Sequence, residues 1–157
     1  MSTVEFVRPA TASDLVELCR LEVAYREAAG STRRGGEQWL RSNPALDLAG
    51  WNMRVSDNSA VTVVAGIDGV VLGFASLRLH SAAHSTSVAA IDGIFVEEGA
   101  RELGLGDAML AALVDGARRL GAEEIEATAL PGDRDTKNLF ERAGLVARLI
   151  TVSKPLS

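Results

Sequence analysis

Residues 91–106 read Ile-Asp-Gly-Ile-Phe-Val-Glu-Glu-Gly-Ala-Arg-Glu-Leu-Gly-Leu-Gly, and this stretch decides the fold. Its first part is apolar and β-prone, which predicts a strand that ends near Val96. After Gly104, apolar residues such as Met109 and Leu113 recur at helical spacing and predict a helix. A glycine-containing loop between a strand and a helix exposes backbone N–H groups, and the helix dipole adds to their attraction for anions. The segment therefore predicts a phosphate cradle at a helix N-terminus.

Taken alone, this loop has a second interpretation. Gly104 and Gly106 would equally serve a tight strand-to-helix turn that binds nothing. The pattern is not a P-loop, because no Gly-Lys-Ser/Thr follows the glycines. It is not a dinucleotide fingerprint either, because no early β-α-β unit surrounds it. Only the context of the whole chain can separate a turn from a phosphate site.

Working outward from the loop, the sequence predicts a β-α-α-β-β-β-α-β-α-β order. Asp68-Gly69 is a strong hairpin signal, and residues 43–58 carry no clear pattern. Such an order predicts a mixed sheet with helices on both faces. The predicted strands are 4–7, 60–67, 70–79, 87–96, 124–130 and 145–152, and the predicted helices are about 12–29, 34–42, 104–121 and 136–143.

Composition limits the classes of protein to consider. The 157 residues, 47% of them apolar, fit one domain with a sizeable core. No apolar run reaches the length of a membrane span and no signal peptide is read, so we expect a cytoplasmic protein. The net charge of −5 and the scattered arginines argue against a nucleic-acid partner and favour a cationic or neutral substrate.

Cysteine and histidine offer little chemistry. The single cysteine, Cys19, excludes an intrachain disulfide and a cysteine metal cluster, and we expect it to be buried. His80 and His84 fall in a predicted loop without a nearby carboxylate, so solvation is favoured over metal binding. Neither histidine sits in a nucleophile motif, so we predict no metal and no Ser-His-Asp or Cys-His site.

Three motifs in the right order resemble the GNAT superfamily of N-acetyltransferases. Arg101-x-x-Gly104-x-Gly106 resembles its acyl-CoA motif, Gln/Arg-x-x-Gly-x-Gly/Ala. The opening VRPATASDL resembles the first strand and helix entry of the family. Residues 133–145, ending Leu-Phe-Glu-Arg-Ala-Gly-Leu, resemble its closing Asn-x-x-Ala-x-x-Leu-Tyr-Glu-x-x-Gly-Phe. The resemblance implies an α/β fold over residues 1–157, as one domain with a mixed, mostly antiparallel sheet and helices on both faces.

The resemblance also implies where acetyl-CoA would lie. Pantetheine would follow the strand edge at Ile94 and Val96, where this strand splays from a parallel neighbour starting at Glu124. The gap would leave backbone donors free to polarise the thioester carbonyl. The pyrophosphate would rest on the backbone amides of Arg101, Glu102, Leu103, Gly104, Leu105 and Gly106.

The implied reaction is acetyl transfer from acetyl-CoA, as cosubstrate, to a primary amine of a small molecule or protein. The amine would attack directly in a ternary complex, and homodimers are common in the family. A protonated amine must first lose a proton, and Asp92 aligns with a glutamate that often accepts it. The alternative for Asp92 is a solvent-facing strand residue beside Gly93. Tyr25 could serve as an acid, but its spacing favours packing against Leu18 and Leu21.

The sequence departs from the family pattern at four positions. Glu102 would repel a pyrophosphate by about 1 kcal/mol or less if it faced it. Asp133 replaces the asparagine that contacts CoA, and Thr136 replaces an alanine. Phe140 replaces the tyrosine that often protonates the departing thiolate. These departures keep a second interpretation open, a GNAT-fold acyl-CoA-binding or regulatory protein with little or no turnover.

Overall fold

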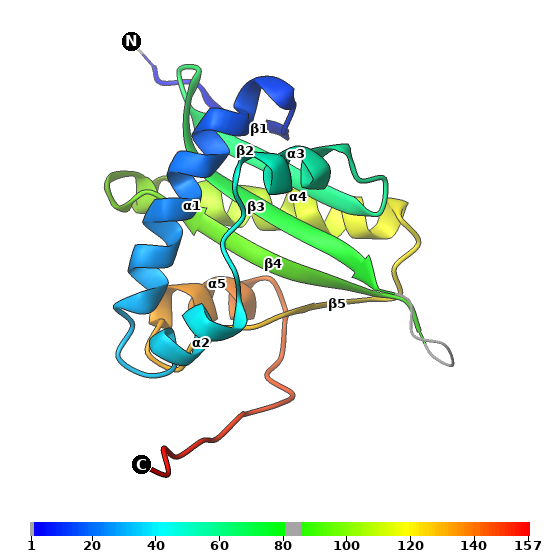
Figure 1. Cartoon of the computed structure of the whole chain (residues 1–157). Helices are drawn as coiled ribbons and strands as arrows, with labels where there is room; N and C mark the ends of the chain where they lie inside the picture. Colours follow the sequence, from blue (N-terminus) through cyan, green and yellow to red (C-terminus); the bar gives the residue numbers. More distant parts are fainter. Residues whose placement is uncertain (1, 81–85) are drawn as a thin grey trace.

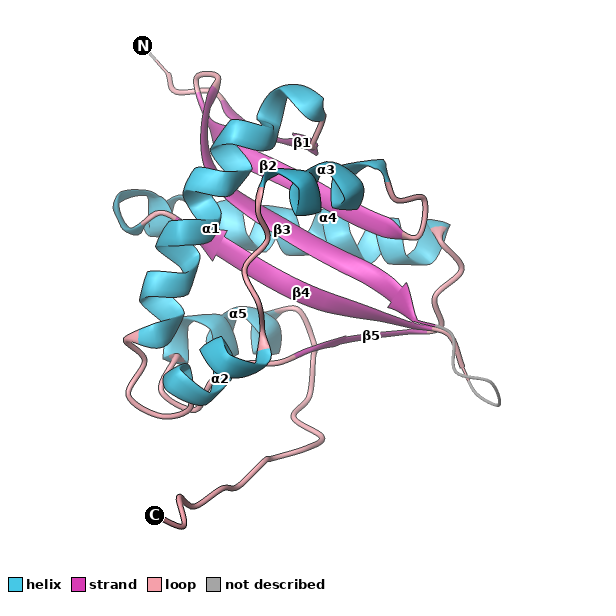
Figure 2. Ribbon diagram, viewed as in Figure 1, coloured by secondary structure: helices cyan, strands magenta, loops and turns pink. Residues whose placement is uncertain are grey.

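A five-stranded sheet forms the centre of the molecule in the computed structural model, which describes residues 2–80 and 86–157 (Figures 1 and 2). Its strand order is β1-β2-β3-β4-β5. The first four strands pair antiparallel, and β5 pairs parallel with β4. This confirms the predicted mixed, mostly antiparallel sheet. The strands are β1 (Glu5–Pro9), β2 (Ala60–Ile67), β3 (Val70–His80), β4 (Val88–Val96) and β5 (Glu124–Ala127).

Helices lie on both faces of the sheet, as predicted (Figure 1). Helices α1 and α3 cover one face, and α4 crosses the other (Figure 1). The short η1 leads into α1, and η2 leads from β4 to α4. The helices are η1 (Ala12–Asp14), α1 (Leu15–Gly30), α2 (Gly36–Ser42), α3 (Leu48–Ser56), η2 (Glu98–Leu103), α4 (Leu105–Arg119) and α5 (Arg134–Arg142).

Two apolar layers hold these helices to the sheet. The α4 layer buries Leu105, Met109 and Leu113 against the strands, with 1% or less of each residue exposed. The α1–α3 layer buries Leu18 and Trp51 against the opposite face. Because both faces are covered, the central strands are nearly continuous apolar runs, which explains their strong signal in the sequence.

A β-bulge interrupts β4 at Asp92. Ser76 pairs with Gly93 while Leu77 pairs with Ile91, so Asp92 is the extra residue. As a result, Ile91 and Ile94 both join the α4 layer although they are three positions apart. The Asp92 carboxylate meets Arg54 of α3 on the opposite face. Bulges re-aim side chains in this way, often beside functional sites.

Two predicted strand assignments need correction, one at the end of the chain and one at the end of β5. The predicted final strand over 145–152 is wrong, because residues 143–157 form neither helix nor strand. Val146, Leu149, Ile150 and Val152 lie 70–88% exposed. Strand propensity becomes structure only when a neighbouring edge supplies hydrogen bonds and packing, and no described strand pairs with this segment. Strand β5 also ends at Ala127 rather than at residue 130.

Helix α3 was not predicted from residues 43–58. The Asp47 carboxylate caps it by accepting the N–H of Gly50 at 2.8 Å. An aspartate three residues before a glycine is a weak start signal, and glycine inside a helix lowers its propensity. Trp51, 1% exposed, anchors the helix on the sheet. Tertiary packing therefore decided this element.

The remaining predictions concern membranes and metals. Across residues 2–80 and 86–157, no helix is both long and apolar enough to cross a membrane. The same residues contain no group of three or more side chains suited to hold a metal ion. His80 is exposed at the end of β3, and His84 lies outside the described residues.

Candidate functional site

Strands β4 and β5 part at the middle of β4. Their pairing starts at Val88 with Glu124 and ends at Ile91 with Ala127. Beyond this point β4 continues to Val96, while the chain after β5 turns away toward α5 (Figure 1). On the β5 side, the edge of β4 from Asp92 to Val96 therefore has no described strand beside it, and Arg101 fills part of this gap through its bond to the Val96 carbonyl. We call this region the β4–β5 splay; it matches the sequence prediction and contains Ile94 and Val96.

The loop that follows β4 ends in an open helix N-terminus. Gly104 adopts a left-handed conformation with φ of 76°, which favours glycine. No heavy atom lies within 4 Å of the position that a Cβ on Gly104 would occupy. Helix α4 begins at the next residue, so its first N–H groups have no intrahelical partner. This geometry fits a phosphate group, which backbone donors and the helix dipole attract.

Gly106 has a different function in the same turn. A Cβ there would contact the Leu139 side chain at 3.5 Å, an ordinary van der Waals distance. Helix α5 therefore packs close to the first turn of α4. Arg142 of α5 also pairs with Asp107 of α4, at 3.1 and 3.2 Å. The positive charge of Arg142 therefore offsets the negative charge of Asp107 near the open N-terminus of α4.

The charged side chains of the loop do not converge on this N-terminus. Arg101 turns back, and its Nε donates to the Val96 carbonyl at 3.1 Å. Its guanidinium lies 5.8 Å from the centre of the Phe95 ring. Glu102 and Leu103 are exposed. Within the loop, the groups left for a ligand at this N-terminus are consequently backbone N–H groups, since Arg101 is engaged by the Val96 carbonyl.

Asp133 and Phe140 have structural roles on α5. The Asp133 carboxylate caps the helix by accepting the Thr136 N–H at 3.1 Å and its hydroxyl at 2.6 Å. Phe140 is 7% exposed and packs in the α4 layer with Leu139. Each of the two residues therefore already has a partner or a packing position within the protein, and their predicted contact with CoA stays a prediction.

Asp92 lies on the other side of the sheet, between two arginines. Arg54 donates to one carboxylate oxygen at 2.9 Å, and Arg78 contacts the other at 3.2 Å. Burial lowers the pKa of the Arg54 guanidinium, and the charge of Asp92 opposes that shift. The Asp92 side chain is 26% exposed. Since a carboxylate offers about four lone-pair sites, Asp92 can still accept a further hydrogen bond.

Arg54 also links Asp92 to a buried polar row. It donates to the Ser76 hydroxyl at 3.2 Å, and Ser76 bonds with the Thr62 hydroxyl at 3.0 Å. Ser76 is 1% exposed. Because every member of this row is hydrogen-bonded, it fixes the Arg54 head group and with it the orientation of Asp92. Sequence patterns did not identify Arg54 or Arg78, since they come from an unassigned helix and a different strand.

Tyr25, for which the sequence favoured packing over a role as an acid, lies against the strand residue next to Asp92. A Cβ on Gly93 would lie 3.2 Å from Tyr25 Cε2 and 3.5 Å from Cζ, so the ring covers Gly93 where the splay begins. The predicted packing with Leu18 and Leu21 is confirmed, since all three belong to the α1–α3 layer. Helical spacing revealed the packing face of Tyr25, but could not show which strand residue it faces.

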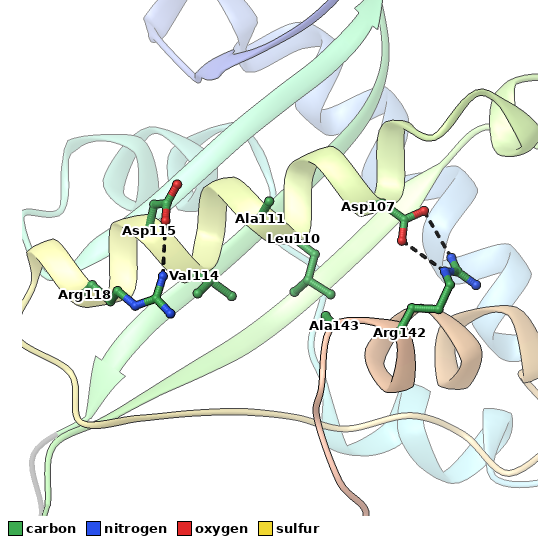
Figure 3. Close-up of a pocket in the computed structure, with 8 residues that line it drawn as sticks. All are labelled: Asp107, Leu110, Ala111, Val114, Asp115, Arg118, Arg142 and Ala143. Atoms are coloured by element: carbon green, nitrogen blue, oxygen red, sulfur yellow. Dashed lines mark hydrogen bonds and ion pairs between the residues drawn. The ribbon is translucent and has the colours of Figure 1, made fainter.

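Two surface hollows lie near the loop between β4 and α4. One, of about 340 Å³, is lined by α1 and the end of β4, including Glu27, Phe95 and Arg101. The other, of about 350 Å³, lies between α4 and the end of α5 (Figure 3). Its lining includes the Asp107–Arg142 pair but none of the predicted site residues (Figure 3). Of the predicted residues, Arg101 lines the first hollow, while Asp92, Ile94 and Val96 lie at the splay.

Several solved structures share this fold. The BH1408 protein of Bacillus halodurans, as a tetramutant, has a TM-score of 0.81 at 18% identity, over 96% of this chain and 99% of that one. A ribosomal-protein-alanine N-acetyltransferase of Brucella melitensis biovar Abortus 2308 has a TM-score of 0.70 at 19% identity, over 98% and 99%. The aminoglycoside acetyltransferase meta-AAC0020, from an uncultured soil metagenomic sample, has 0.71 at 16%, over 98% and 95%.

Sequence comparison is more selective than fold comparison. None of the curated proteins matches this chain. The family model described as "Acetyltransferase (GNAT) family" matches residues 17–145, which include the splay, the loop and α5. This match covers most of the chain and agrees with the strand, loop and helix that carry the acyl-CoA motif. The chain therefore belongs to the GNAT acetyltransferase family.

Proposed function

We propose that this protein transfers an acetyl group from acetyl-CoA to a primary amine by direct attack in a ternary complex. The observation that carries the proposal is the splay of β4 from β5 immediately before the open N-terminus of α4. One feature offers unpaired backbone groups to pantetheine and thioester, and the other offers backbone donors to the pyrophosphate. A single chain segment, 92–106, supplies both.

In this proposal the two substrates approach from opposite faces of the sheet. The pyrophosphate lies over the amides of residues 101–106, and pantetheine runs past Val96 and Ile94 toward Gly93. The acceptor amine approaches from the α1–α3 face, where Asp92 and Tyr25 lie. In this proposal α1, α2 and α3, which cover the acceptor face, determine whether the acceptor is a small molecule or a protein.

Asp92 is proposed to accept the proton that an ammonium acceptor must lose before attack, directly or through water. Its position on the acceptor face and its remaining lone pairs support this role. The paired arginines keep the carboxylate oriented. They also engage both of its oxygens, which favours transfer through a water molecule over direct contact.

The test is release of free thiol from acetyl-CoA in the presence of a panel of amines. The panel contains small diamines, aminoglycosides and peptides with free N-termini. The proposal expects amine-dependent thiol release together with an acetylated product by mass spectrometry. Thermal stabilisation by acetyl-CoA without thiol release from any amine would instead support the acyl-CoA-binding or regulatory alternative, which Phe140 and the capped Asp133 favour.

A further inference from the structure

We infer that the hydroxyl of Tyr25 is the proton donor to the departing CoA sulfur, an assignment that rests on the proposed acetyl transfer. The chain contains a single tyrosine, and the position where the family often has this phenol is occupied by Phe140. Phe140 cannot donate a proton. Tyr25 comes from α1, on the face of the sheet opposite to α4 and α5.

The ring of Tyr25 is held rigidly at the start of the splay. It packs edge to face against Trp39 and Phe74, with ring centres 5.3 and 5.6 Å apart, and lies 5.8 Å from Phe95. These neighbours come from three different elements, α2, β3 and β4. Its Cζ, the carbon that bears the hydroxyl, lies 3.5 Å from where a Cβ on Gly93 would be. Only glycine at position 93 allows this approach without displacement of a neighbour.

The hydroxyl of Tyr25 is free to bind a ligand. It makes no hydrogen bond to any other described residue. Among these residues, the one buried side-chain polar atom without a partner is Nε1 of Trp51, so the Tyr25 oxygen retains solvent access. Burial of the ring, followed by the charges of Glu22, Asp133 and Asp92, raises the pKa of the Tyr25 phenol. The hydroxyl therefore remains a donor throughout the physiological pH range.

Several other side chains on this side of the sheet are less well suited. The guanidinium groups of Arg54 and Arg78 are engaged by Asp92. Burial raises the pKa of the Cys19 thiol, and the charges of Asp47 and Glu22 add to the shift, but a thiol is a weak hydrogen-bond donor. His80 is at the far end of β3. The Tyr25 phenol lies beside Gly93 and retains its proton, which is why we assign it the donor role.

The proposed step conserves atoms and charge. The neutral amine attacks the thioester carbonyl carbon, a C–N bond forms, and the carbonyl π pair moves to oxygen. When the C=O bond reforms, the C–S bond breaks and the sulfur leaves with the bonding pair. The Tyr25 O–H proton passes to that pair, while the Tyr25 oxygen takes a proton from the attacking nitrogen. The products are free thiol and neutral amide, and Tyr25 is restored.

The first experiment compares the wild-type chain with Tyr25→Phe, which removes only the hydroxyl and keeps the ring contacts. We expect kcat to fall by about 10²-fold, in the range found for loss of a general acid. The KM for acetyl-CoA and the melting temperature are expected to stay the same, which separates a catalytic role from a structural one. If the wild type is active and Tyr25→Phe has the same kcat, the assignment of Tyr25 is overturned while the proposed acetyl transfer stands. No thiol release from the wild type with any amine would overturn the proposed acetyl transfer and, with it, this step.

The second experiment tests the contact without turnover. Replacement of the single tyrosine by 3-fluorotyrosine gives one ¹⁹F resonance, which belongs to residue 25. We expect CoA to shift this resonance, and desulfo-CoA, which lacks the sulfur, to shift it less. Identical spectra with saturating CoA and desulfo-CoA would overturn the contact between Tyr25 and sulfur, whatever the outcome of the kinetics.

Discussion

The two faces of the sheet contribute to the site in different ways. On the α4 face, one continuous segment supplies the strand edge, the loop and the helix N-terminus, and it acts mainly through backbone groups. On the α1–α3 face, the candidate groups are side chains from distant parts of the sequence. Tyr25, Arg54 and Arg78 meet Asp92 and Gly93 only because α1 and α3 pack on the sheet and β3 pairs with β4.

The difference teaches which kind of site a sequence can reveal. A backbone cradle depends on local geometry, so glycines at fixed spacing are enough to identify it. A side-chain cluster depends on which strand pairs with which, and on where a bulge turns a residue. Four substitutions can test whether the α4 face is needed for CoA and the α1–α3 face for chemistry.

The largest effect is expected from Gly104→Glu. The left-handed backbone at Gly104 strains any side chain, and the new carboxylate would enter the phosphate cradle. At a ligand concentration one hundred times Kd, acetyl-CoA should stabilise the wild type by about 2.7 kcal/mol, visible as a rise in Tm. The variant should lose this rise entirely.

Gly69→Glu is the matched control for Gly104→Glu. Gly69 has φ of 82° and, like Gly104, no heavy atom within 4 Å of a Cβ, but it lies in the β2–β3 turn. The Gly69→Glu substitution therefore introduces the same strain and the same charge, but outside the loop between β4 and α4. If both variants keep the rise in Tm with acetyl-CoA, the α4 N-terminus is not the CoA site.

The second effect is expected from Asp92→Asn. Turnover should fall by about 10²-fold, because the proton acceptor is lost, while acetyl-CoA stabilisation stays the same. The deficit should shrink as the pH rises, because more of the acceptor amine is then already neutral. Thiol release measured across pH provides the test.

Asp115→Asn controls for loss of a paired carboxylate on the opposite face. Asp115 pairs with Arg118 on the exposed side of α4, at 3.4 Å (Figure 3). Full activity of Asp92→Asn at neutral pH would remove Asp92 from the mechanism. Since Arg54 also loses a partner in that variant, chemical denaturation should accompany the kinetics.

The third effect concerns Phe140→Tyr. Because Phe140 is 7% exposed in the α4 layer, the added hydroxyl is expected to be buried without a partner and to lower the free energy of unfolding by about 1–3 kcal/mol. Turnover should not rise. Chemical denaturation and thiol release measure the two quantities.

A rise in turnover would be equally informative. It would mean that the hydroxyl at position 140 reaches the sulfur from the α4 face, as the family pattern implies. The contrast between the faces would then weaken, because the α4 face would also supply a side-chain acid. The double variant Tyr25→Phe/Phe140→Tyr would show whether the two positions are interchangeable.

The smallest effect is expected from Glu102→Gln. Glu102 is exposed beside the α4 N-terminus, so its repulsion of a pyrophosphate should amount to about 1 kcal/mol or less. CoA should bind slightly more tightly to the variant, and the gain should increase at low salt. Titration calorimetry at two ionic strengths measures it, with Glu123→Gln, beyond the far end of α4, as control. Equal affinities at low salt would mean that Glu102 points away from the ligand.

The sequence by itself determined the fold class and the helix that begins after the glycine-containing loop. Alternating and continuous apolar runs identified β2, β3 and β4, because these strands are buried on both sides. The Arg101-x-x-Gly104-x-Gly106 spacing identified the helix N-terminus, because a left-handed residue before a helix needs glycine. These features depend on local interactions, which short stretches of sequence carry.

The tertiary structure alone decided the α1–α3 side of the site and the end of the chain. The bulge that turns Asp92 toward Arg54 arises from the β3–β4 register, and the approach of Tyr25 to Gly93 arises from packing of α1 on the sheet. Residues 145–152 have strand propensity but form no strand, since no described edge pairs with them. Such outcomes depend on contacts between residues tens of positions apart, and local sequence patterns do not encode those contacts.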